Sequence, residues 1–238
     1  MLRRLTAFCE ALAANEVPAP VRYSSAMSDI DLHVVRMGTG GPPLVLVHGF
    51  TGSSLDWFEV MPRLAEHRDV VAFDHRGHGD SPNTGDAATY TIEQLMADFE
   101  QLVEDQDLDR FHLLGHSMGG VVVQLYVLAH PERVLSLVLM DTMASPSLKF
   151  PMELIDKLTA IARERGMQAL IPKMIETARS RAVVPPRDVI LTNQASKLAS
   201  MDPEAYGALA HSLAEFGSVL DRLSEVTCPT TVLVGELD

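Results

Sequence analysis

Short, uninterrupted runs of apolar residues recur along the chain, and most of them end in glycine or polar residues. Runs of this kind form strands that are buried on both faces, because such strands have no solvent side and show no alternation. Five runs have this form: 43–50, 69–77, 111–117, 134–142 and 230–238. Two weaker β-like stretches, 21–27 and 30–37, precede them. The pattern predicts a sheet that lies between other layers of structure.

Helical periodicity fills the gaps between the first four buried runs. In 91–105 apolar residues return at close to the 3.6-residue spacing of a helix, and Thr91 is a suitable N-cap. Residues 56–66 and 118–130 are also predicted to be helical. Strands that alternate with helices pair in parallel through right-handed crossovers. The sequence therefore predicts an α/β fold: a mostly parallel sheet with helices on both faces.

The alternation stops between residues 143 and 227. This region has no strand-like run and instead contains four amphipathic patterns separated by prolines: 151–165, 167–180, 186–200 and 203–217. A helical insertion between two core strands favours a lid over the site, although an elaborated crossover is the alternative. We therefore expect a core formed by 1–142 and 228–238, with a helical cap formed by 143–227.

Composition narrows the classes of function. The net charge of −13 argues against nucleic acid or an anionic membrane as a partner, because phosphate binding needs clustered Lys and Arg. No window approaches the ~18 consecutive apolar residues of a membrane span. Cys9 and Cys228 form neither a disulfide framework nor a metal-ligand pattern, so we expect a cytoplasmic protein. The absence of nucleotide-binding and metal-binding motifs predicts no cofactor and no metal.

One short motif carries most of the chemical information. Gly115-His116-Ser117-Met118-Gly119 matches G-x-S-x-G between a buried run and a helical pattern. A nucleophile at the tip of a strained turn crowds its neighbours, so the flanking positions must lack side chains. The helix that begins there also directs backbone N–H groups at developing negative charge. We predict that Ser117 is a nucleophile; the alternative is a plain strand-to-helix loop.

A second segment agrees with this prediction. His48-Gly49-Phe50 ends the first buried run, and the backbone N–H of Phe50 can pair with that of Met118 as an oxyanion hole. The side chain of His48 is better explained as ordering its loop through backbone hydrogen bonds. His48, Gly49 and Trp57 are expected at the pocket or its entrance, although core packing explains Trp57 equally well.

Taken together, these segments resemble the α/β-hydrolase fold superfamily, in particular its cap-bearing branch of serine esterases, lactonases and C–C-bond hydrolases. The resemblance is carried, in order, by LVLVHGF, VVAFDHRGHGDS, LLGHSMGG, VLSLVLMDT and CPTTVLVGELD. It implies that Ser117 is the nucleophile, that Phe50 and Met118 supply the oxyanion hole, and that the cap covers the pocket. It also implies a triad acid at Asp238 in the GELD turn. Asp141 is the rival acid, unless it only caps a loop.

The resemblance also implies a histidine after the acid, one helix and one strand later, but the chain ends at the acid itself. None of the nine histidines occupies that place. His116 is expected to point away from the serine, His75 and His78 to order the pocket rim, and His211 to lie on the cap without an orienting carboxylate. We therefore expect a C-terminally truncated chain, an exposed strand edge at 230–235, and little or no hydrolase activity.

The expected substrate is a small molecule with an apolar acyl group, because the cap is rich in Leu, Ile, Met and Ala. Hydrolysis of a carboxylic ester, thioester or lactone through an acyl-enzyme is the first expectation. By resemblance, C–C-bond hydrolysis and cofactor-free haloperoxidation use the same residues and stay open, whereas dehalogenation and epoxide hydrolysis use Asp at the position of Ser117. A non-catalytic protein that binds a small molecule is the alternative of another class. The oligomeric state stays open.

Overall fold

The structure is a computed structural model that describes residues 30–146, 151–181 and 186–235. The β-like stretch predicted at 21–27 and the predicted acid Asp238 lie outside the described residues. Within the described part of the chain, no helix is long and apolar enough to cross a membrane.

Six strands form one sheet in the order β1-β3-β2-β4-β5-β6. Their bounds are β1 (Val34–Met37), β2 (Leu44–Val47), β3 (Val70–Phe73), β4 (Phe111–His116), β5 (Val134–Met140) and β6 (Thr230–Leu233). Only β1 runs antiparallel to its neighbour β3, and all other pairs are parallel. The predicted α/β architecture with a mostly parallel sheet is confirmed.

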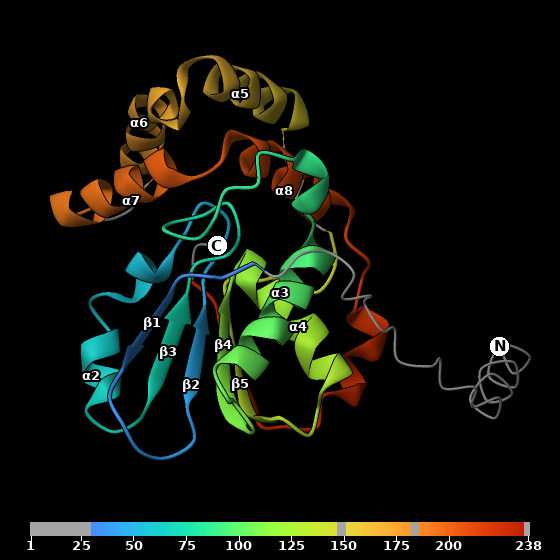
Figure 1. Cartoon of the computed structure of the whole chain (residues 1–238). Helices are drawn as coiled ribbons and strands as arrows, with labels where there is room; N and C mark the ends of the chain where they lie inside the picture. The colour runs from blue at the N-terminus through green and yellow to red at the C-terminus, as the bar shows by residue number, and fades with distance from the viewer. Residues whose placement is uncertain (1–29, 147–150, 182–185, 236–238) are drawn as a thin grey trace, which may run out of the picture.

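Helices cover the sheet and extend beyond one of its ends (Figure 1). The α-helices are α2 (Met61–Ala65), α3 (Ile92–Asp105), α4 (Met118–Ala129), α5 (Met152–Arg165), α6 (Ile171–Arg181), α7 (Asp188–Ser200) and α8 (Pro203–Glu215). Short 3₁₀ helices are η1 (Ser54–Trp57), η2 (Ala87–Thr89), η3 (Met167–Leu170) and η4 (Leu220–Glu225). We call α5–α8 the cap helices; they gather beyond one end of the sheet, and α7 packs on η1 while α8 packs on η2.

Strands β2 and β3 are buried at every position because their side chains point alternately to two cores, whereas β4 and β5 contain half-buried positions between the buried ones. Val45 and Val47 of β2 belong to the larger core, together with residues of α3 and α4. Leu44 and Leu46 belong to a smaller core, which they share with Trp57 and residues of α2 and β3. A strand with this double burial needs apolar residues at every position, which is why β2 and β3 have no alternating pattern.

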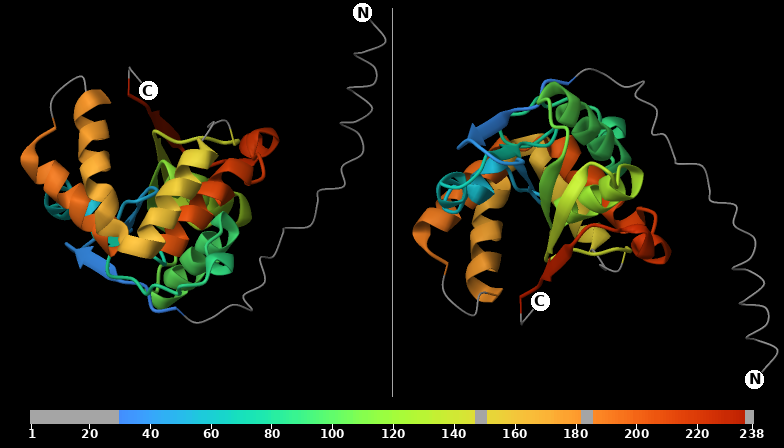
Figure 2. Two further views of the ribbon diagram at one scale, coloured as in Figure 1. Left: turned by 90° about the horizontal axis from the view of Figure 1, so that it is seen from above. Right: turned by 90° about the horizontal axis from the view of Figure 1, so that it is seen from below.

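Strand β6 is the most exposed strand of the described sheet. It forms the outer edge of the sheet (Figure 2), and all four of its residues are exposed. Val232 is 69% exposed and Leu233 is 45% exposed, so apolar side chains as well as backbone groups face solvent. The predicted exposure of this edge is confirmed, and it makes the edge prone to pair with other strands.

A buried ion pair joins the loop after β3 to α3. The guanidinium of Arg76 donates to both carboxylate oxygens of Asp98, at 2.5 and 2.6 Å, and the two side chains are 0% and 3% exposed. Gln94 also donates to Asp98, and the carbonyl of Thr89 accepts a longer bond from Arg76. The loop that follows β3 is thus held by charge-assisted bonds between buried side chains.

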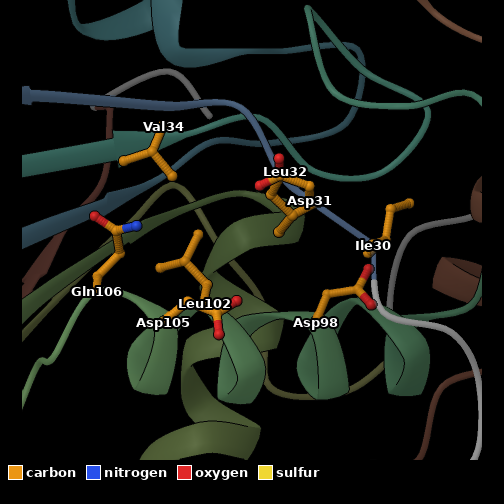
Figure 3. A pocket seen from close by; sticks show the side chains of 8 residues that line it. All are labelled: Ile30, Asp31, Leu32, Val34, Asp98, Leu102, Asp105 and Gln106. Atoms are coloured by element: carbon orange, nitrogen blue, oxygen red, sulfur yellow. The ribbon is translucent and has the colours of Figure 1, made fainter.

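A small cavity borders the same carboxylate (Figure 3). It lies between residues 30–34 and α3 and has a volume of ≈ 30 Å³. This space suits about one water molecule, whereas small-molecule sites need about 300 Å³ or more. The cavity is therefore a packing gap rather than a substrate pocket.

Replacing Asp98 with asparagine is expected to lower the free energy of unfolding by about 3–5 kcal/mol, because the buried Arg76 cation loses its counter-charge. Urea denaturation followed by circular dichroism measures this loss. The control is Lys173→Met, which removes an exposed ion pair with Glu176 and should cost less than about 1 kcal/mol. A loss for Asp98→Asn as small as that of the control would contradict the assignment.

Candidate active site

Ser117 lies at the junction of β4 and α4, in a backbone conformation that non-glycine residues rarely adopt. Its φ is 49° and its ψ is −117°. The end of β5 holds it on both sides: its N–H donates to the carbonyl of Met140 at 2.9 Å, and its carbonyl accepts from the hydroxyl of Thr142 at 2.6 Å. Strain of this kind persists only where the surroundings enforce it, and it clusters at functional sites.

The glycines of the motif are required by close packing. A Cβ at Gly119 would lie 2.4 Å from the carbonyl oxygen of His48 and 2.5 Å from that of Val47. A Cβ at Gly115 would lie 2.5 Å from a methyl carbon of Val123. The first turn of α4 therefore rests directly on the end of β2, which brings the HGF segment beside the serine.

The segment after β2 supplies two features of an oxyanion hole. A Cβ added to Gly49 would lie 3.0 Å from Cβ of Ser117, so this backbone passes close to the serine. Among the described residues, the N–H groups of Phe50 and Met118 have no hydrogen-bond acceptor. Met118 begins α4, where unpaired N–H groups and the positive end of the helix dipole coincide. Two unpaired donors thus flank the serine.

His48 orders this segment from the interior. Its side chain is fully buried; Nδ1 lies 2.8 Å from the carbonyl of Gly49, and Nε2 accepts from the N–H of His75 at 3.0 Å. These bonds place the ring proton on Nδ1, and burial lowers the pKa of His48. The predicted loop-ordering role of His48 is confirmed. Trp57 is 5% exposed and packs in the smaller core. It therefore takes the core position that was expected as the alternative to the pocket entrance.

His75 and His78 are fully buried in the loop after β3, and the expectation that this loop orders the pocket rim stays a prediction. Their rings lie 4.5 and 5.2 Å from that of His48, because the loop after β3 turns inward beneath the site. Burial, with a smaller contribution from His48, lowers the pKa of His78 to about 3. The pKa of His75 also lies well below its usual value, chiefly because of burial. Both rings are neutral packing groups near neutral pH.

The other histidines considered as bases do not reach the serine. Nδ1 of His116 faces the backbone of Gly49, and the exposed His211 lies 2.9 Å from a carboxylate oxygen of Asp156. The expectation that His211 has no carboxylate partner is therefore wrong, but the pair lies at the protein surface. No described residue forms a hydrogen bond with the hydroxyl of Ser117.

Asp141 caps a turn at the end of the sheet. Its φ is 43°, its N–H donates to the carbonyl of Leu233, and its carboxylate accepts from the N–H of Gly235 at 2.9 Å. These bonds match the expectation that Asp141 caps a loop, which was the alternative to its role as the triad acid. Asp238 follows the same turn but lies outside the described residues, so its role stays a prediction.

One group of described residues brings metal-ligating atoms together: His33, Asp74 and Asp80, with atoms within 4.8 Å of one another. The Asp74 carboxylate already accepts the N–H groups of Ser54, at 2.6 Å, and of Asp80, at 2.9 Å. These bonds explain Asp74 as a buried loop-ordering acid without a metal.

A family comparison matches this geometry. The model of the alpha/beta hydrolase fold family matches residues 42–181, more than half of the chain. The chain belongs to the α/β-hydrolase fold family. The match contains the serine motif, the HGF segment and the strands that hold them.

Relatives of this α/β hydrolase perform different reactions. A proline iminopeptidase from Lactobacillus delbrueckii subsp. bulgaricus is 39% identical over 120 residues, which are 48% of this chain and 41% of the relative. A fluoroacetate dehalogenase from Burkholderia sp. is 36% identical over 118 residues, 48% of this chain and 38% of the relative. The chain thus spans less than half the length of either relative. The solved structure of a thermophilic esterase from Thermogutta terrifontis is 29% identical, with a TM-score of 0.73 over 87% of this chain and 75% of that one.

Thr142 is a site residue that sequence analysis did not identify. Its hydroxyl donates to the carbonyl of Ser117, and its side chain lies against Gly120, where an added Cβ would come within 2.3 Å. Thr142 follows β5 by two residues, so the parallel pairing of β4 with β5 brings it to the serine. In the sequence, the only indication of this role was that Thr142 ends the apolar run 134–142, which pairs with the strand before Ser117.

Replacing Gly119 with alanine is expected to lower the free energy of unfolding by about 2 kcal/mol or more, because the new Cβ collides with backbone oxygens. Gly217→Ala is the matched control: an added Cβ there meets no atom within 4 Å, so a change within about 0.5 kcal/mol is expected. Urea denaturation measures both. Equal effects of the two substitutions would contradict the contact between α4 and β2.

His78 is expected to make stability depend on pH. Because its pKa falls from 6.5 to about 3 on folding, the unfolded chain binds more protons than the folded chain between these values. The free energy of unfolding therefore decreases as the pH is lowered through this window, by up to about 1.4 kcal/mol per pH unit from this residue.

Urea denaturation of the wild type and of His78→Gln at several pH values tests this linkage. The difference at pH 8 gives the packing effect of the substitution alone. From pH 6 to pH 4, the wild type should lose stability faster than the variant by about 1.4 kcal/mol per unit. Parallel stability curves for the two proteins would show that His78 is not buried in its neutral form.

Proposed function

We propose that this chain carries the nucleophile and oxyanion hole of a serine hydrolase that acts on carboxylic esters, thioesters or lactones through an acyl-enzyme. One observation carries the proposal. Ser117 is held at φ 49°, and within the described part of the chain its hydroxyl has no hydrogen-bond partner. The N–H groups of Phe50 and Met118, which also have no acceptor there, lie on the two segments beside it. A plain strand-to-helix loop requires neither the strain nor the unpaired donors.

The proposed reaction uses these groups in order. Oγ of Ser117 attacks the acyl carbon and gives up its proton, and the negative charge forms on the former carbonyl oxygen. The two N–H groups stabilise that oxyanion, which is worth about 3–4 kcal/mol per donor in comparable sites. Collapse expels the alcohol or thiol, which takes up a proton. Water then attacks the acyl-serine and releases the acid and the free hydroxyl.

The proton of the serine requires a base, and no described histidine reaches it. We propose Asp238 as the acid of the triad, in line with the family resemblance. A serine without a base is a weak nucleophile, since a general base contributes about 10²–10⁴ in rate.

The substrate proposal rests on the cap helices and on the relatives. Several cap side chains are buried in the larger core: Ile155, Leu170, Leu198, Met201 and Leu209. An apolar cap favours an apolar acyl group over a sugar or nucleotide. The esterase covers most of this chain, whereas the iminopeptidase and the dehalogenase match only about half of it. We therefore place ester hydrolysis before peptide hydrolysis and dehalogenation, and we assign the region 143–227 as the lid.

A non-catalytic binding protein is the second candidate. The observation that favours it is the absence of a described histidine at the hydroxyl of Ser117. This candidate predicts ligand binding without a covalent serine adduct.

Covalent labelling separates the two candidates. The chain is treated with an alkyl fluorophosphonate, with and without imidazole as an external base, and the adduct is located by mass spectrometry. A hydrolase site is expected to label at Ser117, slowly alone and about 10-fold or more faster with imidazole. Ser117→Ala should abolish the adduct.

Ser218→Ala is the matched control, because Ser218 is exposed and lies in a turn, and its loss should leave the labelling unchanged. If Ser117 stays unlabelled with imidazole present, the serine hydrolase proposal is wrong. In that case, saturable binding of a short-chain carboxylic acid in calorimetry supports the binding protein.

A further inference from the structure

The segment that contains Phe50 is contacted by the cap helices as well as by the core. We call residues 48–57 the oxyanion loop; it runs from the end of β2 through η1. Two different cap helices, α7 and α8, contact it at two separate points.

The first contact is an ion pair between Lys197 of α7 and Asp56 of η1. The Lys197 residue is 8% exposed, although Lys is seldom buried without a partner. The other oxygen of Asp56 accepts the N–H of Ser53, and the hydroxyl of Ser53 accepts the N–H of Leu55, which forms a capping box. One carboxylate thus binds both the loop backbone and the cap.

The second contact stacks Tyr206 of α8 on Phe50, with ring centroids 5.4 Å apart and an interplanar angle of 29°. Tyr206 is 8% exposed, and burial raises the pKa of its hydroxyl. Phe50 is the residue whose N–H is the proposed oxyanion donor. The cap therefore touches the loop at the donor residue itself.

The loop needs this support because its backbone is strained. Thr51 has a φ of 59°, and a Cβ at Gly52 would lie 2.3 Å from a carboxylate oxygen of Asp56. A β-branched residue in the left-handed region persists only when its surroundings enforce that conformation. The carboxylate of Asp56 fills the space beside Gly52, so the ion pair sets where the turn can lie.

We propose that docking of the cap sets the geometry of the oxyanion hole, with Lys197 as a positioning residue that acts through Asp56. This inference rests on the proposed function, because only a hydrolase uses the Phe50 N–H in this way. When the cap is docked, Lys197 neutralises Asp56 and fixes the capping box. When it is undocked, the strained turn relaxes and the donor moves away from Ser117. The lid would thus complete the site only when it is closed.

Amide hydrogen exchange of the oxyanion loop tests the proposal. Lys197→Met should speed exchange of the 50–57 amides about 10-fold or more, and Lys197→Arg should restore most of the protection. Trp57, the only tryptophan in the chain, gives an independent signal: its emission should shift to the red in Lys197→Met but not in Lys197→Arg.

Arg187→Met is the matched control. Arg187 also crosses from the start of α7 to the core, where it pairs with Glu59, but that pair is exposed and lies outside the oxyanion loop. This substitution should change loop exchange less than about 2-fold. Unchanged exchange in Lys197→Met, or an equal effect of Arg187→Met, would overturn the proposal.

Asp56→Asn covers the case in which Lys197→Met unfolds the whole cap, because it leaves every cap residue in place. Faster loop exchange with wild-type exchange in α5 supports the proposal, and an unchanged loop rate overturns it. Fluorophosphonate labelling of Ser117 with imidazole reports separately on the hydrolase function. If no variant is labelled, including the wild type, the proposed function fails, while the exchange data still decide whether the cap controls the loop.

Discussion

Ser117 holds a φ of 49° because the end of β5 binds its backbone at two points: the carbonyl of Met140 accepts its N–H, and the hydroxyl of Thr142 donates to its carbonyl. This conformation forces α4 to start directly against the end of β2. The glycines of the motif remove the side chains that would collide there. The spacing of β2, β4 and α4, and with it the approach of the HGF segment to the hydroxyl, follows from that one backbone position.

A second layer of buried polar groups lies behind the site and keeps its loops in place. His48 joins the segment after β2 to the backbone of the loop after β3, and the Arg76–Asp98 pair joins that loop to α3. Neutral histidines and a paired arginine can occupy this interior because each buried charge has a counter-charge. The loops at this end of the sheet are therefore held on the core side. The cap contacts both of them: α7 and α8 contact the oxyanion loop, and Asp202 at the start of α8 bonds to Gly77 and Gly85 of the loop after β3.

The strands were predictable because doubly buried strands appear as continuous apolar runs, and the N-cap at Thr91 was predictable from its side chain. The predicted helices at 56–66 and 167–180 are each divided into a 3₁₀ helix and an α-helix. In both cases a proline, Pro62 or Pro172, stands at the start of the α-helix, where its missing N–H is tolerated.

Side-chain pairs between residues far apart in the sequence were not predictable from local pattern. Lys197 and Asp56 are 141 residues apart, and His211 and Asp156 are 55 apart, so no periodicity connects them. The burial of His75 and His78 follows from the path of a loop through the interior, which composition does not encode. The approach of Phe50 and Met118 to Ser117 was predictable because the motif and the strand order together imply it.

The most direct test of the account is a crystal structure of the chain with a short alkylboronic acid, which forms a tetrahedral adduct with a reactive serine. The account predicts boron bonded to Oγ of Ser117, Ser117 still at positive φ, and one boronate oxygen about 2.7–3.1 Å from the backbone nitrogens of both Phe50 and Met118. A boronate bound elsewhere, or bound to Ser117 with its oxygens turned away from these two nitrogens, would contradict it.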